Sequence, residues 1–213
     1  MGREFLELFE GWASDYDSTV SGKTREYKEV FQNYEEILNQ TAASTGHVVL
    51  EFGVGTGNLT AILHGLGRKV YGIEPSSAMR EKAKAKLPAE IMINDGDFLD
   101  FPEPPEQVDS IVSTYAFHHL TDEEKEKAIG RYGSMLANGG KIIFADTVFT
   151  DRDAYVKKID ESKRRQFTGL VKDLETEYYT THIVMKQIFL KHGFSVSFTQ
   201  MNPFVWIMEA VKQ

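Results

Sequence analysis

Cysteine is absent from the 213-residue chain, and its absence excludes several kinds of chemistry at once. Without thiols the protein forms no disulfide, carries no thiol nucleophile and holds neither a zinc–thiolate site nor an iron–sulfur cluster. Long apolar runs are also absent, since no stretch approaches the roughly 18 residues of a membrane span. The opening residues, MGREFLELFE, carry acids where a signal peptide needs an apolar core. We therefore expect a cytoplasmic protein with no membrane association.

Basic residues are fewer than acidic residues in this chain. The chain has 24 Lys and Arg against 32 Asp and Glu, for a net charge of −8. Binding of nucleic acid over a broad face needs clustered positive charge, so we expect no nucleic-acid partner. The hydrophobic content of 41% and charged content of 26% are typical of one globular domain of this length. The composition gives no indication of the oligomeric state.

Strands alternate with helices from His47 onward. Helical patterns follow the first strands, and no linker separates a second domain. This alternation predicts an α/β fold with a mostly parallel sheet and helices on both faces. The last two strands are joined by a link so short that they must pair antiparallel. The predicted strands are residues 47–52, 69–73, 90–94, 108–113, 141–145, 195–199 and 204–211.

Three glycines follow the first of these strands and precede a helix, in the pattern Gly53-x-Gly55-x-Gly57. Such a turn lets the backbone approach a nucleotide-like ligand closely. A dinucleotide fingerprint needs a third glycine at Asn58, which disfavours a nicotinamide oxidoreductase, and a phosphate loop needs a lysine that is absent. Glu51 would repel a pyrophosphate but attract an ammonium group. The alternative is a tight turn beside a solvated acid.

Two further acids follow the next strands. Glu74 ends the second strand 23 positions after Glu51, a spacing at which a carboxylate accepts hydrogen bonds from ribose hydroxyls. After the third strand, either Asp95 or Asp97 is placed to accept from an adenine amino group, with Phe98 against the ring. The alternatives are an exposed acid at the end of a strand and a polar loop around a buried phenylalanine.

Together with residues 113–120 and 136–144, these motifs resemble those of the S-adenosylmethionine-dependent (class I) methyltransferases, in the order found in that family. The resemblance is to small bacterial members of uncharacterised substrate, and it matches least over residues 151–173. It implies a Rossmann-like, doubly wound, seven-stranded sheet whose last strand inserts antiparallel beside the fifth. It also implies one domain over residues 1–213, with a helical lid at 1–45, a cofactor-binding core at 46–147 and an inserted substrate-side segment at 150–181.

The resemblance further implies S-adenosyl-L-methionine as cofactor and assigns residues to its parts. Glu74 would hold the ribose, and Asp97 the adenine amino group. The other residues assigned to the cofactor are Gly53, Gly55 and Gly57 beside the methionine part, Glu51 near its ammonium, Phe98 and Met79 around the adenine, Tyr16 in the lid, and Thr114.

The end of the fourth strand offers candidates for a catalytic base in Tyr115, His118 and His119, because histidine titrates near neutral pH. The alternative is that the His-His-Leu sequence only shapes the turn. We expect no metal site, because the sequence shows no further histidine or acid at a convincing ligand spacing. Related enzymes that methylate adenine or amides carry Asn/Asp-Pro-Pro-Tyr where this chain has residues 113–116, which disfavours those acceptors.

Phe117, Tyr178 and Tyr179 are the candidates for contact with the acceptor. The alternative for the tyrosines is core packing beside a threonine that caps the next helix. The predicted function is methyl transfer to a small-molecule acceptor. The alternatives are a tRNA or protein methyltransferase, which needs a positive rim, and a non-catalytic module that senses the cofactor.

Overall fold

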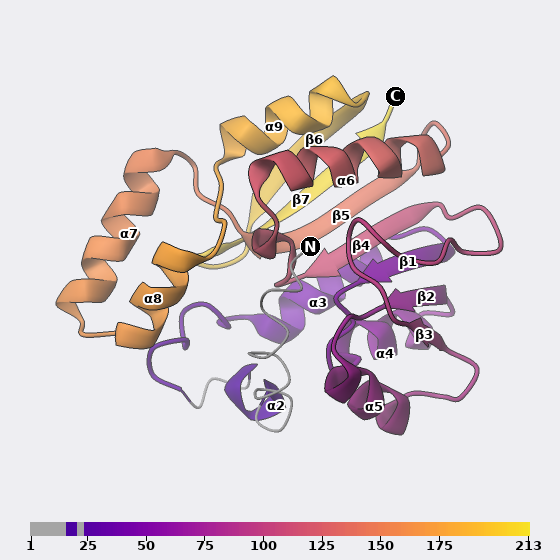
Figure 1. The fold of residues 1–213 in the computed structure, drawn as a ribbon, viewed down its shortest axis with the longest axis horizontal. Coiled ribbons are helices and arrows are strands. Elements are labelled where there is room, and N and C mark those ends of the chain that lie inside the picture. Colours follow the sequence, from indigo (N-terminus) through magenta and orange to yellow (C-terminus); the bar gives the residue numbers. More distant parts are fainter. Residues whose placement is uncertain (1–15, 21–23) are drawn as a thin grey trace.

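The structure is a computed structural model that describes residues 16–20 and 24–213. One seven-stranded sheet with the order β3-β2-β1-β4-β5-β7-β6 runs through it (Figure 1). β1 to β5 are parallel, whereas β7 pairs antiparallel with both β5 and β6. The predicted fold class is thus confirmed, including the last strand beside the fifth. The strands are β1 Val48–Phe52, β2 Lys69–Ile73, β3 Met92–Asn94, β4 Ser110–Thr114, β5 Lys141–Thr147, β6 Phe194–Gln200 and β7 Val205–Lys212.

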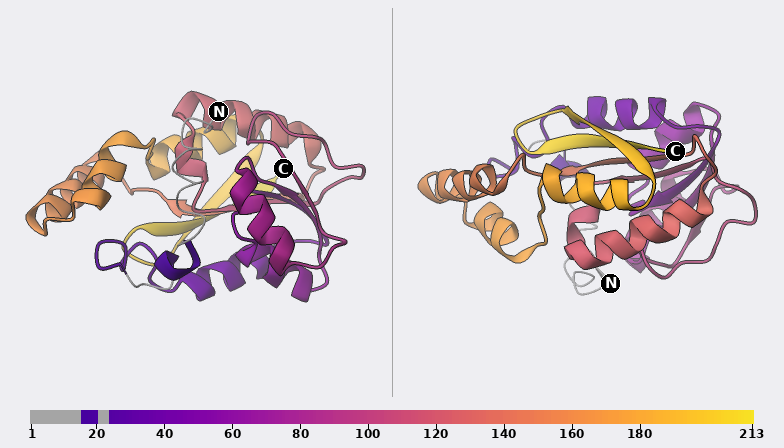
Figure 2. Two further views of the ribbon diagram at one scale, coloured as in Figure 1. Left: turned by 60° about the horizontal axis from the view of Figure 1, so that its bottom comes forward. Right: turned by 90° about the horizontal axis from the view of Figure 1, so that it is seen from above.

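Helices cover both faces of the sheet, and α7 and α8 project from one end (Figure 2). Apolar residues of α6 and α9 pack on one face, and those of α3 and α4 on the other. The described helices are α2 Tyr16–Ser18, α3 Tyr34–Ala43, α4 Asn58–Gly65, α5 Ser77–Lys86, the short 3-10 helix η3 Phe117–His119, α6 Asp122–Met135, α7 Arg152–Arg164, α8 Thr168–Thr176 and α9 His182–Lys191. None of these helices is long and apolar enough to cross a membrane.

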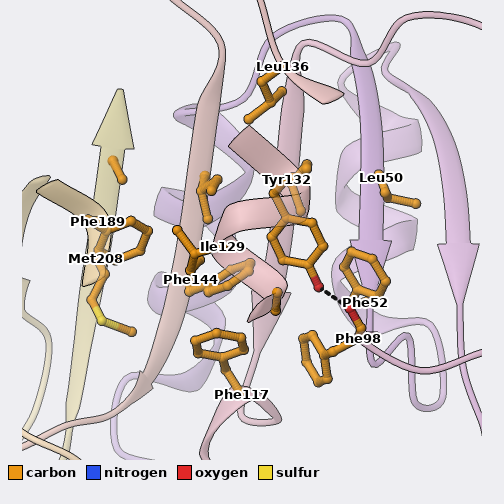
Figure 3. Packing of buried hydrophobic residues seen from close by; sticks show 14 of the residues in the cluster. Leu50, Phe52, Phe98, Phe117, Ile129, Tyr132, Leu136, Phe144, Phe189 and Met208 are labelled. Atoms are coloured by element: carbon orange, nitrogen blue, oxygen red, sulfur yellow. Dashed lines mark hydrogen bonds between the residues drawn. The ribbon is translucent and has the colours of Figure 1, made fainter. Parts of the chain in front are cut away.

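The side chains of each central strand alternate between the two faces, which follows from the two-residue period of a strand. Leu50 and Phe52 of β1 point into the core under α6 and α9, whereas Val49 packs with α3 and α4. Tyr132 of α6 is fully buried in the first of these clusters and donates a hydrogen bond of 2.8 Å to the Phe98 carbonyl (Figure 3). The core therefore anchors the loop that follows β3.

Polar side chains cap the starts of α6 and α9. Thr121 with Glu124 three residues later is a pattern that predicts a capping box, and both reciprocal hydrogen bonds are present at the start of α6. Thr181 accepts a hydrogen bond from the Val184 amide at the start of α9, so the threonine before that helix is a cap. Side chains thus satisfy amides that have no partner inside the helix.

Two predicted helices are wrong in their extent. The apolar pattern over residues 27–38 predicts one helix, but Asn33 has a φ of 62° and α3 begins only at Tyr34. The charge-rich segment 151–173 predicts one inserted helix, but the structure has two, α7 and α8, separated at Gln166 with a φ of 58°. Neither break carries a glycine or proline that would signal it. The apolar pattern of Phe5 to Trp12 lies outside the described residues.

Residues 24–33 are held near the carboxyl end of the sheet by side chains from distant parts of the chain. Asn202 donates to the carbonyls of Val30 and Gln32, and its own carbonyl oxygen accepts the amides at the start of β7. Glu26 accepts the amides of Gly169 and Leu170 at the start of α8. The N-terminal segment and the projecting helices are therefore tied together above the strand ends.

Candidate active site

The glycine loop leaves β1 where the strand order reverses, between β1 and β4, which is the usual ligand position in such sheets. Gly53, Gly55 and Gly57 have φ angles of 68°, 57° and 84°, in the left-handed region that favours glycine. A Cβ on Gly53 would lie 2.8 Å from the Cβ of Ala116, just after β4. The loop therefore needs glycine both for its backbone shape and for its close packing.

Glu74, at the end of β2, is 5% exposed and held at both carboxylate oxygens. One oxygen accepts the Gly55 amide at 2.8 Å and the other accepts the Ser76 amide at 2.9 Å. Burial raises the pKa of Glu74 above its usual range, and these hydrogen bonds and the Arg80 guanidinium oppose that shift. Because a carboxylate offers about four acceptor positions, two remain for a ligand.

Glu74 faces a cavity that is bounded by the ends of β1, β2 and β4 and the loop after β3. Its wall includes eight of the ten predicted cofactor residues, and Glu51 and Gly57 are absent from it. The lining residues are Tyr16, Phe52, Gly53, Gly55, Ile73, Glu74, Pro75, Met79, Gly96, Asp97, Phe98, Thr114, Tyr115, Ala116 and His119.

The loop after β3 presents Asp97 and Phe98 to this cavity. The Asp97 carboxylate accepts the amides of Leu99 and Asp100 at 2.9 and 3.0 Å, which fixes its orientation. The Phe98 ring stacks on Phe52 with the ring centroids 5.2 Å apart. Asp95, the alternative to Asp97, is exposed and pairs with a guanidinium instead. Of the two acids, Asp97 is the one at the cavity.

Glu51 and Gly57 lie behind the loop, toward the helices. The Glu51 side chain is 1% exposed and accepts a hydrogen bond of 2.8 Å from the Thr60 hydroxyl of α4. Burial, with a smaller contribution from the charge of Glu74, raises the pKa of Glu51 to about 8, although the Thr60 bond opposes this. A Cβ on Gly57 would lie 2.7 Å from the Leu87 side chain, so this glycine serves packing. The role of Glu51 beside an ammonium stays a prediction.

Aromatic side chains form another part of the wall. Tyr16 and Tyr115 line the cavity, and the Tyr115 ring lies 5.6 Å from Tyr34 and 5.2 Å from Phe31. Burial raises the pKa of both Tyr16 and Tyr115. Both phenols therefore stay protonated near neutral pH, which argues against Tyr115 as a general base. Tyr115 also has a φ of 55°, a strained backbone angle for a bulky residue.

The two histidines after β4 turn toward a common carboxylate. His118 Nδ1 lies 2.6 Å from Asp146 and its Nε2 lies 3.4 Å from Glu177. His119 Nδ1 lies 2.9 Å from the Ala116 carbonyl, and its Nε2 lies 3.7 Å from Glu177. Although burial lowers it, the Asp146 carboxylate raises the pKa of His118 overall, whereas burial and the neighbouring His118 lower that of His119.

The sequence did not single out Asp146 or Glu177. Asp146 lies near the carboxyl end of β5 and is 2% exposed. An acid at the end of an apolar strand is the signal that identified Glu74, so the same reading would have found Asp146. Glu177 comes after α8, far from the histidines in sequence, and nothing in the sequence connects them.

The three residues predicted to contact the acceptor, Phe117, Tyr178 and Tyr179, lie in different environments. Phe117 is 1% exposed and packs against Phe144 and Phe98 in the core, so it has little surface left for a substrate. Tyr179 stacks on the His118 ring with centroids 5.0 Å apart, whereas Tyr178 is 38% exposed. Contact of Phe117, Tyr178 and Tyr179 with the acceptor stays a prediction.

The cavity combines a fixed, buried carboxylate with apolar and aromatic walls. It suits a ligand that has adjacent hydroxyl groups and a flat ring, as an adenosyl group does. The Ser113 hydroxyl, buried near Gly53, has no hydrogen-bond partner within the described part of the chain. A buried polar atom without a partner is costly.

Known proteins resemble this chain along its whole length. A methyltransferase-domain family model matches residues 49–140. An uncharacterized methyltransferase of Geobacillus sp. strain WCH70 is 60% identical over 213 residues, covering 100% of both chains. One from Bacillus licheniformis is 56% identical over 212 residues, again covering 100% of both. Magnesium protoporphyrin IX methyltransferase from Synechocystis PCC 6803, crystallised with S-adenosylmethionine, shares the fold with a TM-score of 0.71 at 17% identity, covering 100% of this chain and 97% of that one.

Proposed function

The chain belongs to this family of bacterial methyltransferases, and we propose that it methylates a small-molecule acceptor. It is an enzyme, and S-adenosylmethionine is its cofactor. When bound, the cofactor supplies an electrophilic methyl group on a sulfonium. The residues of the chain bind the two reactants, orient them and exclude water.

The observation that carries the proposal is the setting of Glu74. Its carboxylate is buried, fixed by two backbone amides and exposed to the cavity. Two ribose hydroxyls would donate to the two acceptor positions of the Glu74 carboxylate that the backbone amides do not occupy. Asp97 would accept from the adenine amino group, and Phe98 and Met79 would pack around the ring. Gly53 and Gly55 let the backbone approach the methionine part.

The surface charges favour a small acceptor over a nucleic acid. Within the basic run of residues 163–165, Lys163 pairs with Glu175 at 2.7 Å and Arg165 pairs with Glu29 at 2.8 Å. These cations are therefore balanced by acids of the same chain, on a protein with a net charge of −8. Binding of tRNA needs uncompensated positive charge along its contact surface.

The test uses S-adenosylmethionine labelled in its methyl group, incubated with the protein and a bacterial cell extract, followed by separation by size. We expect label in the small fraction, and its loss in Glu74→Ala but not in Glu81→Ala, which changes an exposed acid on α5. Label in the large fraction would contradict the proposal in favour of a tRNA or protein acceptor. Cofactor binding without transfer to either fraction would favour a sensing module.

A further inference from the structure

His118 and His119 are consecutive in η3, yet both imidazoles approach the carboxylate of Glu177, which follows α8. One ligand atom of each of the three residues lies within 4.8 Å of the others. The separations from Glu177 are 3.4 Å for His118 Nε2 and 3.7 Å for His119 Nε2. Ligand atoms at about 2.0–2.2 Å from a tetrahedral zinc ion lie about 3.3–3.6 Å from one another. The two measured separations run to different oxygens of Glu177 and are close to this spacing, and the three ligand atoms need to draw together from within 4.8 Å to enclose an ion.

The other nitrogen of each ring determines which atom is offered to a ligand. The Ala116 carbonyl can only accept, so His119 Nδ1 carries the proton of that contact and a neutral ring has its lone pair on Nε2. The Asp146 carboxylate holds His118 Nδ1 in the same way at 2.6 Å. Histidines that bind metals are typically oriented by such an acceptor. When both rings are neutral, both Nε2 lone pairs are directed at the Glu177 carboxylate, and a cation bound between them would satisfy all three groups.

The groups around the cluster add negative charge. The side chains of Asp146 and Glu177 are 4% and 9% exposed. Lys125 is a cation near enough to lower the pKa of His118 by its charge. The Lys125 ammonium is itself bound to the carbonyls of Leu120 and Tyr178. The Tyr179 hydroxyl donates to Glu177 at 2.5 Å and so orients this carboxylate as well.

We propose that His118, His119 and Glu177 bind one divalent transition-metal ion, with zinc the best match to two imidazoles and one carboxylate. This departs from the expectation from sequence, which found no third ligand. Three protein ligands leave a fourth position open, as in zinc sites that bind a substrate or water. His119 also forms part of the cavity wall, so the site adjoins the proposed active site. The proposal does not rest on methyl transfer, because metal binding is measured without cofactor or acceptor.

The test is calorimetric titration of the metal-free, full-length protein with Zn²⁺ alone, repeated with Co²⁺, whose visible absorption reports coordination geometry. We expect one equivalent to bind, with the Co²⁺ spectrum of a four-coordinate site. Glu177→Gln and His119→Asn should each weaken binding at least about 100-fold. Asp146→Asn, which changes the carboxylate that orients the His118 ring, should weaken it about 10–100-fold.

The controls are Glu175→Gln and His64→Asn, which change exposed residues of the same types, and they should bind as the wild type does. Circular dichroism checks that every variant is folded. Wild-type affinity no higher than that of Glu177→Gln would overturn the proposal. So would equal losses in the two control variants, because the ion would then bind adventitiously at the surface.

Discussion

Glu51 gives the structure a defined dependence of stability on pH. Its pKa in the folded protein is about 8, against an ordinary value of 4.5, because the side chain is buried beneath the glycine loop. Between these values the unfolded chain releases a proton that the folded protein retains. Folding stability therefore falls as pH rises through this window, and Glu51→Gln, which carries no proton to lose, should remove the dependence.

The magnitude follows from the difference between the two pKa values. Each pH unit well inside the window lowers the free energy of unfolding by up to about 1.4 kcal/mol. From about pH 5 to about pH 7, the wild type should lose about 2.5 kcal/mol relative to Glu51→Gln, a loss that levels off above about pH 8. The other titrating groups are common to both proteins and cancel in the difference.

The assay is urea unfolding of both proteins at several pH values, with Glu35→Gln, an exposed acid on α3, as the matched control. A constant difference between wild type and Glu51→Gln across the window would refute the reasoning, because Glu51 would then ionise as an exposed acid does. If Glu51 lies beside the cofactor's ammonium as predicted, saturating S-adenosylmethionine should favour the ionised form of Glu51 and weaken the dependence of wild-type stability on pH.

Three further substitutions test how the site is supported. Gly53→Ala puts a Cβ 2.8 Å from a neighbouring side chain and should weaken cofactor binding, measured by calorimetry, more than about 10-fold. The control is Gly67→Ala, which has a φ of 72° but open space around it, and it should leave cofactor affinity unchanged. Tyr132→Phe leaves the Phe98 carbonyl unpaired and should lower the free energy of unfolding by about 1–3 kcal/mol in urea, and unchanged stability would contradict this. Asn202→Ala removes four hydrogen bonds to the backbone and should lower the free energy of unfolding by at least about 2 kcal/mol. A melting temperature equal to that of the wild type would show that these bonds do not hold residues 24–33 in place.

The sheet and much of the cavity wall were predictable because their signals are local. A strand, a glycine loop and a helix follow one another within residues 48–65, and Glu74 ends the next strand. Parallel strands bring their carboxyl ends to one edge, so residues at those ends converge without any knowledge of long-range contacts. The position of Asp97 at the cavity follows from the same rule.

The extent of α3 and the separation of α7 from α8 were not predictable by such rules. Asn33 and Gln166 adopt left-handed backbone angles without the glycine that normally signals them. The contacts of the two histidines could not be predicted from the sequence for a different reason. Glu177 reaches His118 and His119 because the chain returns to the strand ends after α8, where the Tyr178 amide donates to the His118 carbonyl. Hydrophobic periodicity carries no information about that contact.

Glu74 is the residue on which the account of the cofactor depends most directly. Each hydrogen bond from a ribose hydroxyl to its carboxylate should contribute about 1.5–3 kcal/mol. Loss of two such bonds in Glu74→Ala corresponds to an affinity at least about 100-fold lower. An S-adenosylhomocysteine analogue without ribose hydroxyls separates this effect from damage to the loop, because it should bind wild type and variant almost equally.

The decisive measurement is therefore calorimetric titration of S-adenosylmethionine into wild-type protein, Glu74→Ala and the exposed control Glu81→Ala. The account predicts one site in the wild type, the same affinity in Glu81→Ala and binding at least about 100-fold weaker in Glu74→Ala. Equal affinity in all three folded proteins would contradict it, because the ribose would then lie somewhere other than at the end of β2.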